Sequence, residues 1–187
     1  SYLMASRYIN VEAREGERMG DMYGIGYERV SSDPNDKYYD KTGQYVGQIV
    51  YSSNGKPVAT TETIKLGNYN PDWLSGIRNT FGYKGLNLSV LFDTRQGGKI
   101  YSHTQTVGRE GGTLIETLEG RADGYDLSKE GNGVIGDGVI QNADGTFTPN
   151  DVKLSAREWH TSYTLGRRIV EGVMYDASFT KLREVTL

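Results

Sequence analysis

The sequence predicts an all-β protein built from antiparallel strands, with little helix. Three observations support this prediction. The 187 residues include 25 glycines and 14 tyrosines, only 36% of them are hydrophobic with a mean hydropathy of -0.59, and apolar and polar residues alternate in several segments. Such a composition favours strands and turns over helices. No run approaches the roughly 20 apolar residues of a membrane-spanning helix, although barrel strands would give a much weaker signal.

The first third of the chain predicts short strands separated by turns. Residues Tyr2–Val11 mix apolar and polar side chains and are expected to form a short strand. In Met22–Val30 glycines separate the aromatic residues, which is typical of a bent strand. The cluster Asp33-Pro34-Asn35-Asp36 predicts a turn after that strand.

A hairpin is predicted in Gln48–Ala59. Asn54-Gly55 at its centre is the pair that type I′ turns favour. Pro57 follows the turn and cannot donate to a ladder of hydrogen bonds, so the returning arm is expected to be an edge strand or a loop.

The clearest pattern is a second hairpin between Asn68 and Gly98, with a tight turn at Lys84-Gly85. Because strand side chains alternate with period two, folding the two strands together places six apolar residues on one face. They form three facing pairs, Tyr83 with Leu86, Phe81 with Leu88, and Ile77 with Phe92. The opposite face collects the polar residues Arg78, Thr80, Asn87, Ser89 and Asp93. We expect Arg78 and Asp93, near one end of this face, to form an ion pair or a polar wall.

The hairpin pattern by itself fits two structures equally well. A soluble sheet would turn the apolar face toward a protein core. A membrane barrel would turn it toward lipid, over roughly 9–11 residues per strand.

The region after this hairpin differs in composition and lacks the alternating pattern. From His103 to Gly172 the chain is rich in Gly, Asp, Asn and Thr and predicts a long loop, which in a compact domain is usually functional. Within it, Gly111–Leu118 could form a turn of helix or a short strand. Alternation resumes near Val173, with Tyr175 and Phe179 on one phase.

Charge and cysteine content exclude several classes of function. The net charge is -3 without a basic block, so nucleic acid is not an expected partner. The absence of cysteine from these residues excludes disulfides, zinc-thiolate sites and cysteine nucleophiles within them. No signal peptide is visible, and Lys181–Leu187 has the pattern of a strand, so we expect this chain to be cut from a longer sequence.

No motif predicts catalytic or metal-binding residues. Gly131–Gly136 spells G-x-G-x-x-G but lacks the flanking strand and helix of a dinucleotide site. The series Asn142, Asp144, Gly145 and Asp151 resembles part of a calcium loop, yet a turn at Asp144-Gly145 is the better interpretation. His103 and His160 are expected to be solvated or locally hydrogen-bonded. We therefore predict no enzyme, no cofactor and no metal.

Five segments, in this order, resemble the SusC/RagA family of TonB-dependent outer-membrane transporters of Bacteroidota. They are Gly20–Tyr27, Leu66–Trp73 with Asn-Pro-Asp-Trp, Asn79–Gly85 with Tyr-Lys-Gly, Gly97–Tyr101, and Tyr175–Val185 with Lys-Leu-Arg-Glu. The resemblance covers nearly the whole chain. It implies a 22-stranded barrel around an N-terminal plug. Residues 1–187 would form a late part of this barrel domain, a partial wall with long extracellular loops, and the plug and the closing strands would be missing.

The resemblance also implies an orientation for the central hairpin. The turn at Lys84-Gly85 would be periplasmic, whereas the segment before Asn68 and the stretch His103–Gly172 would be extracellular. Three sets of residues follow from this. The lipid-facing set is Ile77, Phe81, Tyr83, Leu86, Leu88, Val90 and Phe92. The lumen-facing set is Arg78, Thr80, Asn87, Ser89 and Asp93. The aromatic girdles would be Trp73 and Tyr101 at the outer interface and Tyr83 at the inner one.

By the same resemblance, the whole protein would import a large nutrient across the outer membrane, an oligosaccharide or in some relatives a peptide. Its partners would be a SusD-like surface lipoprotein, the TonB complex and the outer-membrane lipid. The alternative from another class is a secreted or cell-surface β-rich carbohydrate-binding module. That module would stack Trp73 and Trp159 on sugar rings and would fold alone in water.

Overall fold

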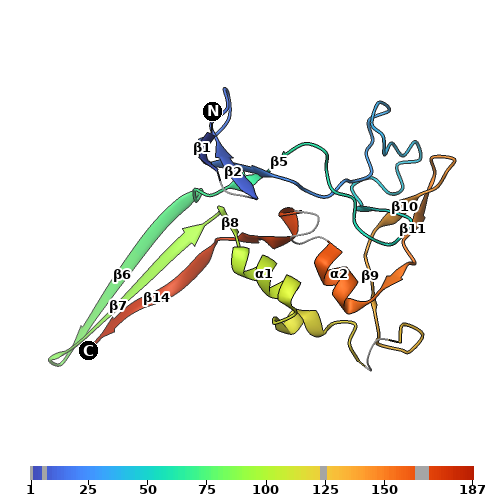
Figure 1. The fold of residues 1–187 in the computed structure, drawn as a ribbon. Coiled ribbons are helices and arrows are strands. Elements are labelled where there is room, and N and C mark those ends of the chain that lie inside the picture. Colours follow the sequence, from blue (N-terminus) through green and yellow to red (C-terminus); the bar gives the residue numbers. More distant parts are fainter. Residues whose placement is uncertain (1, 6–7, 123–125, 163–168) are drawn as a thin grey trace.

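The computed structural model describes residues 2–5, 8–122, 126–162 and 169–187, and of residues 2–5 only the backbone. Within these ranges the chain forms short strands paired mostly antiparallel, with little helix, which confirms the predicted fold class. In Figure 1 one long sheet projects as an arm from a body that contains the remaining elements. No helix among the described residues is long and apolar enough to cross a membrane.

The N-terminal part of the body is a four-stranded antiparallel sheet. In spatial order its strands are β1 (Tyr2–Ala5), β2 (Ile9–Glu12), β3 (Asp21–Gly24) and β5 (Ile64–Asn68). The segment predicted as one short strand is therefore two paired strands, and the strand predicted for Met22–Val30 ends at Gly24. Ile9, Val11 and Met22 form a buried cluster beneath this sheet. Tyr101 and Met174 pack against it from the pair β8 (Lys99–Tyr101) and β13 (Met174–Asp176).

A second core lies at the other end of the body. It is covered by a three-stranded sheet in which β10 (Val139–Gln141) lies between β11 (Phe147–Pro149) and β4 (Val50–Tyr51). The β4–β10 pair is parallel, although more than 80 residues separate the two strands in the sequence. Five residues form the buried cluster: Val30, Tyr38, Val50, Val139 and Phe147.

Turns form at both predicted places in this part of the chain, but the turn at Asn54-Gly55 is not of type I′, because Gly55 adopts a positive φ (75°) and Asn54 does not. The amide of Asp36 donates to the carbonyl of Asp33 (3.0 Å), and the amide of Gly55 donates to that of Ser52 (2.8 Å). The returning arm of the second turn makes only an isolated bridge, Tyr51 with Pro57, as expected for a proline at that place.

The stretch His103–Gly172 is not the long irregular loop that the composition suggests. Its described residues form α1 (His103–Gly111), the 3-10 turn η1 (Ile115–Leu118), the pair β9 (Val134–Ile135) and β12 (Lys153–Leu154), and α2 (Ala156–Ser162), as well as β10 and β11. A second 3-10 turn, η2 (Glu171–Val173), follows. Capping residues explain both helices, since polar side chains satisfy the amides that a helix start leaves without partners.

The caps are local. For α1, the hydroxyl of Ser102 accepts from the amide of Gln105 (3.2 Å) and the left-handed Gly112 ends the helix. For α2, Ser155 and Glu158 form a reciprocal capping box, with the amide of Glu158 donating to the Ser155 hydroxyl (3.3 Å). The S-x-x-E spacing was visible in the sequence and marks the helix start that the loop interpretation overlooked.

The arm is a three-stranded antiparallel sheet. Its central strand β7 (Leu86–Gln96) pairs with β6 (Trp73–Tyr83) on one side and with β14 (Phe179–Thr186) on the other. The turn between β6 and β7 places Lys84 and Gly85 at φ 49° and 85°. Two consecutive left-handed residues are what a two-residue type I′ hairpin requires, so the tight turn at Lys84-Gly85 is confirmed.

Candidate functional site

The candidate site is the arm, because the structure assembles there the face predicted from the sequence. In the β6–β7 pair, Tyr83 lies opposite Leu86, Phe81 opposite Leu88 and Ile77 opposite Phe92. The predicted register is therefore confirmed, and with it the sharing of one face by these six residues. Val90, which continues the same alternation, lies opposite Asn79 on this face.

The third strand extends the apolar face through a β-bulge. Leu182 lies opposite Phe92 and Val185 opposite Val90, and the register shifts between Leu182 and Glu184. A regular strand would turn residues 182 and 184 to one face and 185 to the other. The extra residue Arg183 lets Leu182 and Val185 both lie on the apolar face. We call this surface of the three strands the apolar face, and the opposite surface the polar face.

The apolar face is not covered by the rest of the described chain. Phe81 is 60% exposed, Tyr83 is 73% exposed and Leu182 is 57% exposed. Neither of the two buried clusters includes a residue of the arm. A contiguous apolar surface of this kind on an isolated protein marks a binding or membrane surface, because it costs free energy in water. The arm is thus held in place by strand pairing and not by a core beneath it.

Sequence analysis missed some polar residues on this face. Asn79 shares the face with Phe81, and one end of the face carries a row of hydroxyls, Ser75 opposite Thr94 and Thr94 opposite Thr180. The hydroxyls of Thr94 and Thr180 lie 2.8 Å apart and bond to each other. The period-two alternation already places Asn79 on the apolar face. The sequence analysis did not name it, because one polar residue leaves the apolar pattern of this face recognisable.

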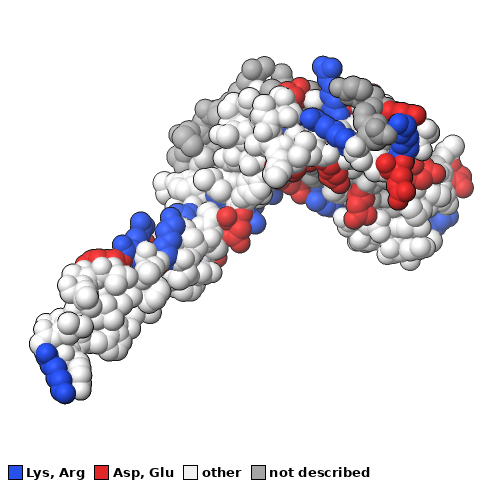
Figure 2. All heavy atoms as spheres, turned by 90° about the horizontal axis from the view of Figure 1, so that it is seen from below, with Lys and Arg blue, Asp and Glu red and all other residues white. Residues whose placement is uncertain are grey.

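On the polar face, charges pair across strands. The guanidinium of Arg78 on β6 reaches over Leu91 to Glu184 on β14 (2.9 Å), and Arg183 donates twice to Asp93 (2.8 and 2.9 Å). Figure 2 shows these strands as an arm with positive and negative side chains grouped along its middle, a positive side chain at its tip, and uncharged surface between the two. Arg78 and Asp93 therefore both belong to ion pairs, which was one of the two expected arrangements. Each of them pairs with a residue of β14.

The remaining lumen-predicted residues lie on this polar face. Thr80 lies opposite Ser89, with their hydroxyls 3.5 Å apart, and Asn87 lies opposite Gly82 near the turn. Their orientation toward a lumen stays a prediction.

The base of the arm is tied to the body by polar contacts. Arg18 forms an ion pair with Asp72 (2.9 Å) and donates to the carbonyl of Pro71, while Arg95 donates to the carbonyl of Tyr69 (2.5 Å). Trp73 begins β6 at this base and is 53% exposed. Tyr101, the other residue predicted for the outer girdle, is half-buried against the cluster beneath β2 and β3, and its place in a girdle stays a prediction.

A buried ionic group stabilises the sheet next to this base. Asp21 is 1% exposed, bonds to the ammonium of Lys65 (2.5 Å) and accepts from the amide of Asn68 (2.8 Å). Burial acts to raise the pKa of Asp21, but the hydrogen bonds from Lys65 and Asn68 outweigh it, and the pKa lies below its usual range. The carboxylate stays charged at neutral pH and holds β3 to β5.

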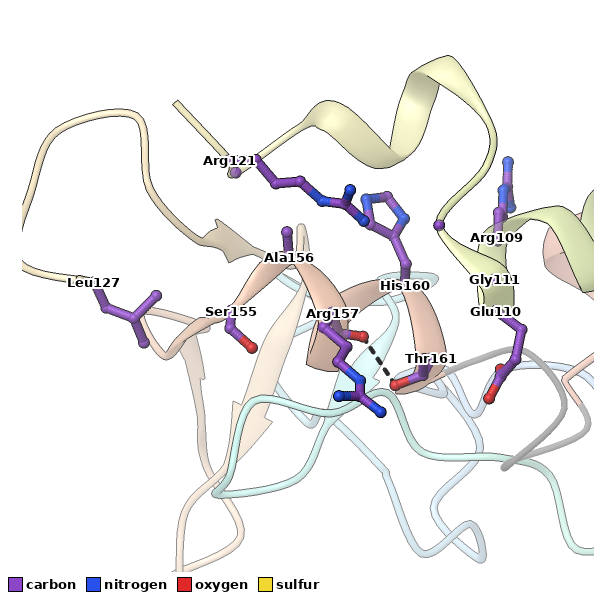
Figure 3. A pocket seen from close by; sticks show the side chains of 12 residues that line it. Arg109, Glu110, Gly111, Arg121, Leu127, Ser155, Ala156, Arg157, His160 and Thr161 are labelled. Carbon is purple, nitrogen blue, oxygen red and sulfur yellow. Dashed lines mark hydrogen bonds between the residues drawn. The ribbon is translucent and has the colours of Figure 1, made fainter. Parts of the chain in front are cut away.

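A hollow in the body lies between α1 and α2, with a volume of about 590 Å³. Arg109, Arg121 and His160 line it, and Figure 3 shows the Arg121 guanidinium beside the imidazole of His160. His160 is 3% exposed, so of the two expected states, solvated or locally hydrogen-bonded, burial excludes the first, and burial lowers its pKa. His103 is exposed and stacks on Tyr8 with ring centres 5.6 Å apart.

The other motifs are resolved as turns and loops. The amide of Gly145 donates to the carbonyl of Asn142 (3.0 Å), which confirms a turn at Asp144-Gly145. Gly131 and Gly133 both adopt positive φ in the connection before β9. Among the described residues no group of three or more His, Asp or Glu could hold a metal ion. Trp159 stacks on Tyr51, with ring centres 6.2 Å apart.

Fold and arm together define the class: an antiparallel β-rich chain whose longest sheet has one apolar and one polar face, both open. No protein-family model matches the chain. A curated protein, TonB-dependent receptor P3 of Formosa agariphila, is similar to it, with 24% identity over 182 residues. This similarity covers 92% of the chain but only 15% of the receptor, so the chain spans a small part of the length of its curated relative.

Proposed function

We propose that this chain forms part of the barrel wall of a TonB-dependent outer-membrane transporter of the SusC/RagA type. The observation that carries the proposal is the uncovered apolar face of β6, β7 and β14, whose opposite face carries ion pairs. The similarity to a TonB-dependent receptor points in the same direction, toward a transporter and not an enzyme. In this arrangement the apolar face contacts hydrocarbon chains and the polar face lines the lumen.

The dimensions of the hairpin suit a membrane span. Trp73 and Tyr83 end an 11-residue strand, so at about 3.3 Å per residue they lie roughly 33 Å apart along it. A strand tilt of about 40° reduces this to a height of about 25 Å, which is the height of the apolar band of outer-membrane barrels. Trp73 and Tyr83 then lie at the two interfaces, where aromatic side chains are favoured.

The two edges of the arm support the same arrangement. Among the described strands, β6 and β14 each pair on one side only. Open backbone donors and acceptors cost several kcal/mol each in hydrocarbon, so neighbouring strands must cover both edges. The rest of the barrel would supply those strands, and the body at the base of the arm would lie on the extracellular side.

The finer parts of the proposal concern the transported compound and the partners. By resemblance, the cargo is a large nutrient, an oligosaccharide or a peptide, captured with a SusD-like lipoprotein and moved with energy from the TonB complex. Uptake of a fluorescent oligosaccharide that disappears on deletion of TonB, together with co-purification of the lipoprotein, would support these parts. Uptake that persists without TonB would contradict them.

The membrane assignment is tested by site-directed spin labelling of β7. The chain contains no cysteine, so single cysteines can be placed at each position from 86 to 92 of the full-length protein in lipid vesicles, after replacement of any cysteine elsewhere. We expect accessibility to oxygen, which concentrates in lipid, to peak at Leu86, Leu88, Val90 and Phe92. Accessibility to a water-soluble nickel complex should peak at Asn87 and Ser89. A profile without this alternation, or with the two reagents exchanged, would refute the proposal.

A further inference from the structure

A groove at the end of the body farthest from the arm offers a second binding site. It has a volume of about 490 Å³ and lies between the loop 37–45 and the β10–β11 hairpin. The side chains that line it include Tyr39, Lys41, Gln44, Tyr45, Gln141 and Asp144. We propose that this groove, called the loop–hairpin groove, binds a neutral oligosaccharide.

Aromatic surface is the first requirement for such a ligand. Tyr39 and Tyr45 both line the groove and are half-buried. Tyr45 also packs against the buried cluster of Val30, Val50 and Phe147, so its ring is held from behind. Rigid tyrosine rings provide large contact area at low entropic cost and can cover the C–H face of a sugar ring.

Hydrogen-bonding groups with unused capacity are the second requirement. Among the described residues, the side chains of Gln44 and Lys41 form no hydrogen bond. Asp144 uses one carboxylate oxygen for the amide and hydroxyl of Thr146 (2.9 and 2.6 Å), which leaves the second oxygen to accept from a ligand. Gln141 donates to the carbonyl of Lys37 (3.1 Å), and its own carbonyl is available. A sugar hydroxyl both donates and accepts, so a mixed set of donors and acceptors suits it.

The charges of the groove cancel, which selects for a neutral ligand. Two lysines, Lys37 and Lys41, are balanced by two aspartates, Asp40 and Asp144. Hydrogen bonds from the Thr42 hydroxyl and from the Tyr45 amide lower the pKa of Asp40, and bonds from Thr146 lower that of Asp144, so both stay charged at neutral pH. An anionic or cationic ligand would find no net attraction here.

The groove is formed before any ligand binds. One oxygen of Asp40 accepts from the amide and hydroxyl of Thr42 (2.9 and 2.6 Å), and the other accepts from the amide of Tyr45 (2.9 Å). The amide of Asp40 donates in turn to the carbonyl of Ser31 (2.9 Å). A loop that is already ordered loses little entropy on binding, which favours affinity.

The place of the groove agrees with capture from outside the cell. In Figure 1, β10 and β11 lie at the opposite end of the molecule from the tip of the arm. The chemistry of the groove is independent of the membrane assignment. Only its extracellular location rests on the proposed function.

The test measures binding by the full-length protein in detergent micelles. An array of neutral oligosaccharides, acidic oligosaccharides and short peptides is screened, and the strongest neutral binder is titrated by calorimetry. Gln44→Ala and Tyr39→Ala should each weaken its affinity by roughly three- to tenfold, the loss expected for one hydrogen bond or one stacking contact. Gln48→Ala is the matched control, because Gln48 is also exposed and close in sequence but does not line the groove. It should change affinity by less than about twofold.

The inference is overturned if no neutral oligosaccharide binds, or if acidic oligosaccharides or peptides are the only ligands. It is also overturned if Gln44→Ala and Tyr39→Ala behave like Gln48→Ala while all three variants keep their thermal unfolding profiles. Spin labelling of β7 separates this failure from that of the proposed function. A protein that inserts but shows no groove binding refutes the groove alone, and one that binds but does not insert refutes the membrane assignment alone.

Discussion

The sharpest prediction concerns two neighbouring residues on opposite faces of β7. Val90 lies on the apolar face between Asn79 and Val185, and Ser89 lies on the polar face between Thr80 and Thr186. The same substitution at both sites, Val90→Arg and Ser89→Arg, keeps chain position, strand and charge nearly constant. Only the face changes, so each variant is the control for the other.

The expected magnitude follows from depth. Asn79, which faces Val90, lies six residues from Trp73 and four from Tyr83, which places Val90 about 15 Å and 10 Å from the two interfaces for 3.3 Å per residue and a tilt of about 40°. An arginine this close to the midplane on the lipid face should cost about 2–4 kcal/mol. On the polar face, beside Glu184 and water, Ser89→Arg should stay within about 0.5 kcal/mol.

The assay is denaturant unfolding of the full-length protein in phospholipid vesicles, followed by tryptophan fluorescence. We expect the free energy of unfolding to fall for Val90→Arg and to be nearly unchanged for Ser89→Arg. Equal effects of the two variants would refute the assignment of faces. A large effect of Val90→Arg without lipid contact in the spin-label experiment would show that another protein surface, and not lipid, covers the apolar face.

The remaining predictions concern the turn of the arm and the buried ionic group of Asp21 and Lys65 next to the base of the arm. Lys84 adopts a positive φ, so Lys84→Asn should stabilise the hairpin by up to about 1 kcal/mol and Gly85→Ala should destabilise it by about 1–2 kcal/mol, as measured by the same unfolding assay. The pKa of Asp21 is lowered in the folded state, so its stabilising effect is present above the unfolded value near 4 and is lost as the pH falls below it. Asp21→Asn should remove that part of the acid sensitivity in a series of thermal melts. The pKa of Lys65 is raised, and its contribution should be lost only when the pH rises above about 10.5.

Most of the structure of the body could not be predicted from sequence patterns. Sequence composition made 103–172 look irregular, but the contact between two short helices, a parallel β4–β10 pair and the two-residue strands β9 and β12 give its described residues an ordered structure. Contacts of this kind join residues far apart in the chain. No window of sequence contains both partners, so neither periodicity nor turn chemistry could predict them.

The register of the central hairpin was determined by the sequence itself. Its information is local, since the Lys84-Gly85 pair selects a two-residue turn and the turn then decides which residues face each other. Alternation with period two sorts those residues between two faces. Both features depend on residues that are close together in the sequence. The sequence alone was therefore enough to predict that Phe81 lies opposite Leu88.

Only the tertiary structure decided what joins this hairpin. The choice of β14 as the third strand, the bulge at Arg183 that returns Val185 to the apolar face, and the pairing of Arg78 with Glu184 involve residues about 90 to 106 positions apart. Their energies depend on which strands become neighbours, and chain closure over such distances is a property of the whole fold. The physical reason is the same for the loop–hairpin groove, whose two walls meet only once the second core has formed.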